Sequence, residues 1–401
     1  MEILFGGMAL LAVPPLLLII SVIGLLKSPK QWRLFYVGYI ISIAIIAYSW
    51  IPQSTPDITR YFYMLEQCAS MTLNEINMFF DDGLFVKNYI FWLISRTGNV
   101  HLLPAISTGT VYGIASYITC SYCENEGKER YIPIIMIFQF MSFPFFSITS
   151  NIRNVWCFAL ITLAVYRDLY QKRNNACTLC LYILPCFIHN GGWILIGVRL
   201  ICILAKRFRF IAIIVAFGVA SIIDYLYSII FYLPNKAVIN MVKVAHNYLY
   251  EKNSAYALSV ASNIGDRLSR YTAMILAVLV VVYIFLRIKE QENKANFNTY
   301  EFLVASAVIG FNAFTVPHYW RLSVAMTMGI APVLSRMIDD FYAKRKYYCA
   351  FVNVVFLMAC TQLFLQVKTT SGLVDYTQLL TDSMLNNVYV VLLSSIRGLM
   401  R

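Results

Sequence analysis

Charge is scarce in this sequence, and acidic charge is scarcest. Only 13% of its 401 residues are charged, whereas 60% are hydrophobic and the mean hydropathy is +0.66. A soluble domain of this length needs far more polar surface, so these proportions exclude an ordinary water-soluble fold. Lys and Arg outnumber Asp and Glu by 32 to 20, but they stand in short clusters between apolar runs. That arrangement argues against nucleic-acid binding and is typical of membrane topology signals.

The sequence also lacks the motifs of several common chemistries. It has no glycine-rich phosphate loop, no Gly-x-Ser-x-Gly elbow and no zinc-protease motif, which argues against nucleotide-driven chemistry. Most of its ten cysteines lie within or beside apolar runs, so no disulfide framework is expected. Two Cys-x-x-Cys pairs lack a second ligand pair, and Asp81-Asp82 alone is weak evidence for a metal. We therefore expect neither a metal nor a cofactor.

Apolar runs of membrane-spanning length recur along the chain. A helical span needs roughly 20 apolar residues. Ten runs approach that length: Ile3 to Leu26, Leu34 to Ile51, Leu102 to Thr119, Tyr131 to Ile148, Val155 to Tyr170, Phe210 to Leu233, Tyr271 to Leu286, Tyr300 to Phe314, Leu322 to Met337 and Tyr347 to Leu365. The sequence therefore predicts an all-α polytopic integral membrane protein. We expect residues 1–401 to form a single transmembrane domain of about 11–12 transmembrane or half-spanning helices.

A further apolar segment, Cys177 to Ala205, decides the topology. Every basic cluster faces the cytoplasm if the N-terminus is outside and this segment enters and returns on the same side. A single 29-residue helix would instead put the basic residues at 206–209 outside and invert everything downstream. The charge pattern favours a broken pair hinged at His189-Asn190-Gly191-Gly192. Irregular backbone at membrane depth is tolerated only against protein or water, so the hinge indicates a polar pocket.

Two long loops face outward in this topology, residues 52–100 and 234–270. The first carries Asp57 and Arg60, followed by an aromatic stretch from Tyr89 to Ile94 that suits a membrane interface. The second mixes charge signs and predicts an amphipathic helix. We expect both loops to cover an outward-facing cavity. Asp57 and Arg60 are either a solvated ion pair or part of a site at which Asp57 is an alternative base.

Arg153 and His189 are predicted at the outer ends of apolar helices, and Arg321 falls on the same side. Ionisable groups at the edge of a hydrocarbon layer are costly and usually mark a site for an anionic or polar ligand. Two arginines suit a diphosphate, and an imidazole can accept a hydroxyl proton. The alternatives are an interfacial arginine on lipid headgroups and a histidine bonded to freed backbone. Asp224 and Arg199, inside predicted spans, are expected to form a structural ion pair.

The order of these features resembles the EpsG family of bacterial exopolysaccharide polymerases, functional relatives of the Wzy O-antigen polymerases. The shared pattern is an outer-loop Asp followed by Tyr, an Ile-Arg at a helix start, a His after an apolar run and a late Arg heading a span: Asp57, Tyr61, Arg153, His189 and Arg321. The resemblance covers roughly Pro56 to Arg336. The chain departs from the family's pattern directly after the arginine and the histidine, where it has Asn154 and Asn190.

The resemblance implies a glycosyltransferase at the outer face of the bacterial cytoplasmic (inner) membrane. It would polymerise undecaprenyl-diphosphate-linked oligosaccharide repeat units into an O-antigen, capsule or exopolysaccharide, without a metal or cofactor. Membrane lipids, a flippase and a chain-length regulator of the same pathway would be its partners, and nucleic acid would not. Arg153 and Arg321 would stabilise the leaving diphosphate, and His189 or Asp57 would take the acceptor proton. The implied substrate-binding residues are Arg60, Tyr61, Asn154, Asn190, His318 and Tyr319.

A flippase or exporter of the same lipid-linked oligosaccharides is the alternative. It would spread cationic residues through both leaflets and often carry internal repeats, whereas these candidates gather at one face. A membrane acyltransferase would need access from the cytoplasm. A structural subunit of a secretion complex would leave Arg153 and His189 without a task. The placement of the charged candidates therefore favours the enzyme.

Overall fold

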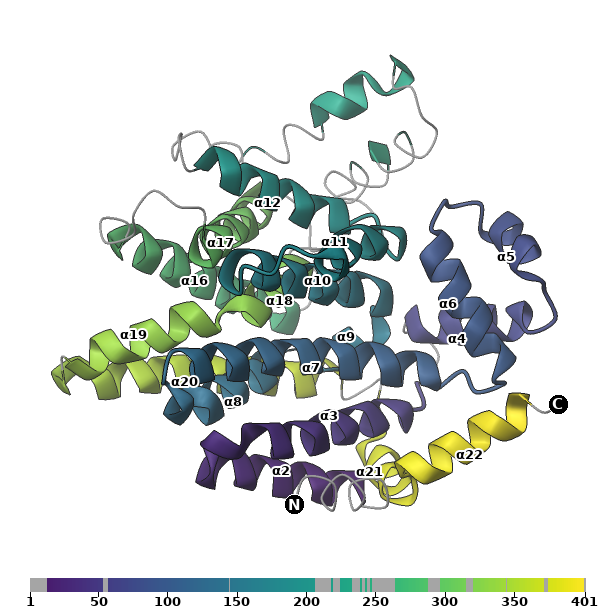
Figure 1. The fold of residues 1–401 in the computed structure, drawn as a ribbon, viewed down its shortest axis with the longest axis horizontal. Helices are drawn as coiled ribbons and strands as arrows, with labels where there is room; N and C mark the ends of the chain where they lie inside the picture. The colour runs from purple at the N-terminus through teal and green to yellow at the C-terminus, as the bar shows by residue number, and fades with distance from the viewer. Residues whose placement is uncertain are drawn as a thin grey trace.

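A computed structural model describes residues 13–52, 57–143, 145–205, 218, 224–232, 239, 242–243, 246, 264–287, 296–314, 320–343, 345–370 and 374–399. All regular structure in these ranges is helical, which confirms the predicted all-α class (Figure 1). Residues 3–12 of the first predicted span, most of the span from Phe210 to Leu233 and most of the loop 234–270 lie outside the described residues.

The helices follow one another closely along the chain. Up to residue 205 they are α2 (Pro14–Lys27), η1 (Pro29–Gln31), α3 (Trp32–Tyr48), α4 (Asp57–Cys68), α5 (Leu73–Phe80), α6 (Phe85–Arg96), α7 (Leu102–Asn125), η2 (Glu129–Tyr131), α8 (Ile132–Ser142), α9 (Phe145–Ser150), α10 (Ile152–Val165), the π-helical turn η3 (Tyr166–Tyr170), α11 (Ala176–Ile183), η4 (Leu184–Phe187) and α12 (Gly192–Ala205). After residue 205 the described helices are η5 (Ile230–Tyr232), α16 (Ile264–Arg287), α17 (Phe297–Phe314), α18 (Trp320–Gly329), α19 (Ala331–Ala343), α20 (Arg345–Thr370), α21 (Tyr376–Leu385) and α22 (Val388–Leu399).

The long helix α7 runs through the middle of the bundle, with α3 packed along it (Figure 1). Small residues allow the two backbones to approach closely, as is common between apolar helices. A Cβ at Gly109 would lie 3.0 Å from the Ala44 Cβ, and the Tyr36 hydroxyl donates to the Gly113 carbonyl at 2.9 Å. A side chain at either glycine would push α3 and α7 apart.

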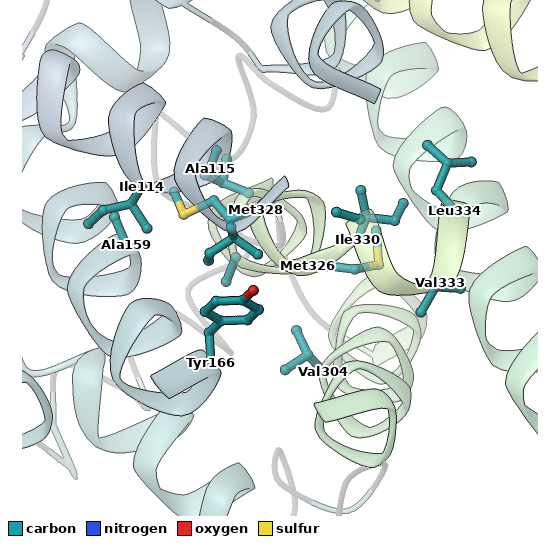
Figure 2. Packing of buried hydrophobic residues seen from close by; sticks show 14 of the residues in the cluster. Ile114, Ala115, Ala159, Tyr166, Val304, Met326, Met328, Ile330, Val333 and Leu334 are labelled. Carbon is teal, nitrogen blue, oxygen red and sulfur yellow. The ribbon is translucent and has the colours of Figure 1, made fainter. Parts of the chain in front are cut away.

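The main hydrophobic core joins α7 to α10, α17 and α18. Met326 and Met328 of α18 lie among side chains from these helices, including Ala115, Ala159 and Val304 (Figure 2). All five residues are 1% exposed or less. This core fixes α10 and α18 against each other, and these two helices carry Arg153 and Arg321.

A second, smaller hydrophobic core holds α4, α5 and α6 at one end of the bundle, a part called here the α4–α6 unit (residues 57–96; Figure 1). Ile58, Leu65 and Phe91 of the unit pack with Leu103 of α7 and Ile152 of α10. The aromatic stretch predicted for the membrane interface therefore belongs to α6, whose buried face contributes to this core. The unit is anchored directly beside the start of α10.

Three predicted spans are broken. The run from Tyr131 to Ile148 is divided between α8 and α9, the run from Val155 to Tyr170 ends in the π-turn η3, and α18 and α19 meet at an angle of 57°. Among the described residues, one helix is long and apolar enough to cross a membrane, Pro29–Tyr48. Two bent pairs would raise the number to three. The multi-pass architecture therefore stays a prediction.

The segment from Cys177 to Ala205 forms two helices, with the break at residues 188–191. Asp168 of η3 contacts both limbs, because it accepts hydrogen bonds from the Tyr182 hydroxyl at 3.0 Å and from Arg199 Nε at 2.7 Å. The two limbs thus lie against the same end of α10, as a hairpin requires. The expected pair of Arg199 with Asp224 was wrong: Asp224 is instead 3.5 Å from His246, since η3 already supplies Arg199 with a carboxylate.

Candidate anion-binding site

Arg153 lies in the first turn of α10, where Tyr61 of the α4–α6 unit holds its guanidinium. Arg153 Nε donates to the Tyr61 hydroxyl at 2.9 Å, and the guanidinium carbon is 5.2 Å from the centre of the Tyr61 ring. Tyr61 is itself 4% exposed and packs edge to face on Phe91. Within the described residues, no acceptor bonds to either Nη atom of Arg153 and no carboxylate forms a salt bridge with it. The terminal fork is therefore oriented and open to an anion.

His189 lies at the break between η4 and α12, beside α10. Its carbonyl oxygen is 3.5 Å from the Cys157 thiol, which donates to it. Cys157 follows Arg153 by one helical turn on the same face of α10. A Cβ on Gly192 would lie 2.7 Å from the Cys157 sulfur, so the hinge can approach α10 only because this residue is glycine. The break thus places His189 one turn from Arg153.

The orientation of the His189 ring follows from its own turn. Nδ1 accepts a hydrogen bond from the Gly191 amide at 2.9 Å. The lone pair of Nδ1 is therefore engaged, and the neutral ring carries its proton on Nε2. In this state His189 acts through Nε2 as a hydrogen-bond donor.

The start of α18, which carries Arg321, lies at the same end of the bundle as Arg153. Tyr166, just after α10, packs on Phe297 at the start of α17 with ring centres 5.6 Å apart. Glu301, one turn further along α17, lies against Gly329 at the end of α18. These contacts place the C-terminal ends of α10 and α18 together. The N-terminal ends of the two helices therefore lie together at the opposite end of the bundle. The Arg321 side chain, and His318 and Tyr319 entirely, lie outside the described residues.

The remaining predicted residues form no second cluster among the described residues. Asp57 and Arg60 form an ion pair of 3.3 Å and are 44% and 53% exposed, which fits the solvated pair considered from the sequence. Arg60 also lies 5.5 Å from the centre of the Tyr61 ring. Asn154 is buried on α10, and Asn190 is half-buried in the hinge.

Lys87 is a cation that sequence reasoning missed. Its side chain is 2% exposed, forms an ion pair with Asp82 and lies 3.9 Å from the centre of the Phe80 ring. The pKa of Lys87 is lowered to about 8, chiefly by burial. The positive charge of Arg153 also lowers it, whereas the Asp82 carboxylate opposes the shift. Asp82, considered from the sequence as a metal ligand, is thus the partner of a buried amine. A single lysine in an otherwise apolar and aromatic stretch was the available signal.

The α4–α6 unit also reaches the hinge. Phe85 at the start of α6 packs on Phe187 of η4 with ring centres 4.4 Å apart, and Phe187 in turn contacts Trp193 of α12. Arg153, Lys87 and His189 are thus joined through one set of packed elements. A cavity of about 190 Å³ lies between α2, α3 and α8, but its lining is apolar and includes none of these residues. Among the described residues, no three His, Cys, Asp or Glu side chains form a group suited to a metal.

Comparisons with protein-family models, with curated proteins and with solved structures found no match for this chain.

Proposed function

We propose that this chain is a multi-pass membrane glycosyltransferase of the EpsG or Wzy type, which polymerises oligosaccharides carried on undecaprenyl diphosphate. The observation that carries the proposal is the Arg153 guanidinium, fixed through Nε by Tyr61 while both Nη atoms lack an acceptor among the described residues. A fork held in this way binds phosphate oxygens without first losing a protein partner. The broken helix that carries His189 lies beside it.

The outer surface of the bundle supports a membrane location. Large apolar side chains point outward along α2, α16 and α20, including Leu16, Ile19, Ile23, Ile275, Val282, Phe285, Phe356, Leu357 and Phe364, each 45% exposed or more. Water would solvate such stripes poorly, whereas lipid tails would cover them. Several of these helices are shorter than a full span, so we infer that broken and tilted helices cross the layer together. The α4–α6 unit would then lie at the outer face.

The proposed reaction is a displacement at an anomeric carbon. An acceptor hydroxyl oxygen bonds to that carbon, the bond to the diphosphate oxygen breaks, and undecaprenyl diphosphate leaves with the electron pair. Arg153 and Arg321 stabilise the charge on the departing diphosphate, and His189 donates to it through Nε2. Removal of the acceptor proton then falls to Asp57, on the same helix as Tyr61, once the substrate separates it from its exposed ion pair with Arg60.

The test is the surface-glycan ladder of cells whose chromosomal copy carries His189→Ala. We expect long chains to collapse to single repeat units with the protein still present in the membrane, because loss of one preorganised donor slows such steps by about 10²–10³. His189→Gln keeps a hydrogen-bond donor, so this variant should still make chains of intermediate length. If His189 were a general base, His189→Gln would be as defective as His189→Ala.

His101→Ala is the matched control, since His101 packs between Tyr48 and Phe62 and has no role in the proposed reaction, so it should leave the ladder unchanged. An unchanged ladder in His189→Ala would contradict the proposed mechanism. Loss of all surface glycan, single units included, would instead favour the transport alternative.

A further inference from the structure

The joint between α5 and α6 buries a cation, Lys87, that is close enough to Arg153 to be affected by its charge. Asp81 ends α5 in a left-handed conformation and Gly83 follows with a φ of +70°, so the chain turns sharply into α6. Asp82 accepts from the Leu84 amide at 3.0 Å and also pairs with Lys87. The turn therefore directs the Asp82 carboxylate at a lysine that has almost no contact with solvent.

The two cations near this joint differ in their partners. Lys87 and Arg153 both carry positive charge, and within the described residues Asp82 is the one carboxylate that bonds to either of them. The Phe80 ring face offers Lys87 a weak additional interaction. The Cys68 thiol is the other titratable group near Lys87, and burial raises the pKa of that thiol, so it stays neutral at neutral pH. Lys87 thus has a carboxylate partner, whereas the half-buried guanidinium of Arg153 has none among the described residues and can take an anion.

We propose that Lys87 binds phosphate oxygens together with Arg153, and that Asp82 is its counter-ion in the absence of ligand. The identity of the ligand as a diphosphate rests on the proposed function. Arg153 contributes a planar fork and Lys87 a compact point charge, two different donors for two neighbouring phosphate groups. Ligand binding turns the Lys87 ammonium from Asp82 towards the anion, and Asp82 competes with the ligand for the same cation.

Binding should depend on pH in a definite direction. Lys87 is charged below its pKa, which burial and Arg153 lower to about 8, with Asp82 and Cys68 opposing. Anion binding is therefore strongest below pH 8 and weakens above it, by at most about tenfold per pH unit. Lys87→Arg keeps the charge throughout this range and should remove most of that dependence.

The test is calorimetric titration of the purified full-length protein in detergent with inorganic pyrophosphate. We expect Lys87→Met to weaken binding by tenfold or more at pH 7. Asp82→Asn, compared with the wild type at pH 6 so that the amine stays protonated without its carboxylate, should tighten it, because the competing carboxylate is gone. The wild type should lose about tenfold in affinity between pH 7 and pH 9, while Lys87→Arg changes little.

Lys30→Met is the control for removal of one positive charge, because Lys30 is exposed in η1, and it should bind as the wild type does. The inference is overturned if Lys87→Met binds normally, or if Asp82→Asn weakens binding as Lys87→Met does, the pattern of a purely structural ion pair. The tighter binding expected for Asp82→Asn cannot arise from misfolding. Pyrophosphate carries no sugar, so its binding does not depend on polymerase activity. The expected binding pattern, together with an unchanged ladder in His189→Ala, would therefore refute the polymerase proposal and leave the inference about Lys87 standing.

Discussion

In the proposed site, Arg153 has two tasks that a lysine could not combine. Its Nε is fixed on the Tyr61 hydroxyl at 2.9 Å, and its two Nη atoms are left for a ligand. A lysine has one nitrogen, so it could serve either Tyr61 or the ligand, and only at a single point.

We therefore predict that Arg153→Lys loses most polymerising activity although the charge is kept. Hydrogen bonds to charged groups contribute about 1.5–3 kcal/mol, which corresponds to a loss of roughly tenfold to a hundredfold. The measurement is the rate of chain extension in membranes with matched protein abundance. Arg33→Lys, in an exposed pair with Glu124 on other helices, should change the rate little. A rate in Arg153→Lys within about twofold of the wild type would make Arg153 a headgroup or topology residue.

Sequence patterns singled out Arg153 and His189 as candidates because each is a polar exception at the end of an apolar run, and such exceptions are visible locally. Lys87 was not recognised, because its importance depends on contacts made in space: the Phe80 ring, the Asp82 carboxylate and the field of Arg153. The tautomer of His189 was equally hidden, since it depends on how the turn directs the Gly191 amide.

At the scale of helices, hydrophobic runs predicted where helices occur but not where they break. Phe143 is extended, with φ −78° and ψ 125°, because the following proline disfavours the helical conformation, and α8 ends there. Pro332 has no amide proton with which to continue the hydrogen bonds of α18, so α19 starts afresh at 57°. The break at residues 188–191 was predicted, because charge parity required it and two glycines allow it.

The joint between α18 and α19 is a place where one methyl group matters. A Cβ at Gly329 would lie 1.8 Å from a carboxylate oxygen of Glu301, which is fully buried. Both of its carboxylate oxygens lack hydrogen-bond partners among the described residues. We predict that Gly329→Ala destabilises the protein by about 1–3 kcal/mol through overpacking.

A double-mutant cycle separates this clash from other effects. Glu301→Ala removes the obstructing carboxyl, so Gly329→Ala should cost much less in that background. The measurement is the midpoint of thermal unfolding in detergent for the wild type, both single variants and the double variant. An equal cost of Gly329→Ala in the two backgrounds would show that Glu301 does not limit the approach of the helices.

At the scale of the whole molecule, the proposed orientation makes a prediction about access. The α4–α6 unit should face outward and the loop after α7 inward. Met78 in α5 is 79% exposed, and Asn125 at the end of α7 is also exposed. In a cysteine-free variant, Met78→Cys should react with a membrane-impermeant maleimide on intact cells, whereas Asn125→Cys should react only after permeabilisation. The reverse pattern would invert the topology.

The C-terminal helices return to the end of the bundle at which the α4–α6 unit lies. The Asn386 side chain donates to the Ser49 hydroxyl at 3.0 Å, and the Asn99 side chain donates to the Ser394 hydroxyl at 3.0 Å. The same Asn99 amide donates to the Tyr48 hydroxyl at 2.9 Å, and the Tyr48 ring lies 5.6 Å from that of His101. The end of α3 and the start of α7 are therefore side by side.

This adjacency bears on how such a chain can evolve. Because the chain leaves α3 and re-enters α7 at neighbouring points, the α4–α6 unit has the topology of an insertion between two helices that pack along each other. Its exchange for another unit would leave the bundle and Arg153 in place while replacing Tyr61 and Lys87. New substrate preferences could thus be acquired by recombination of one short gene segment.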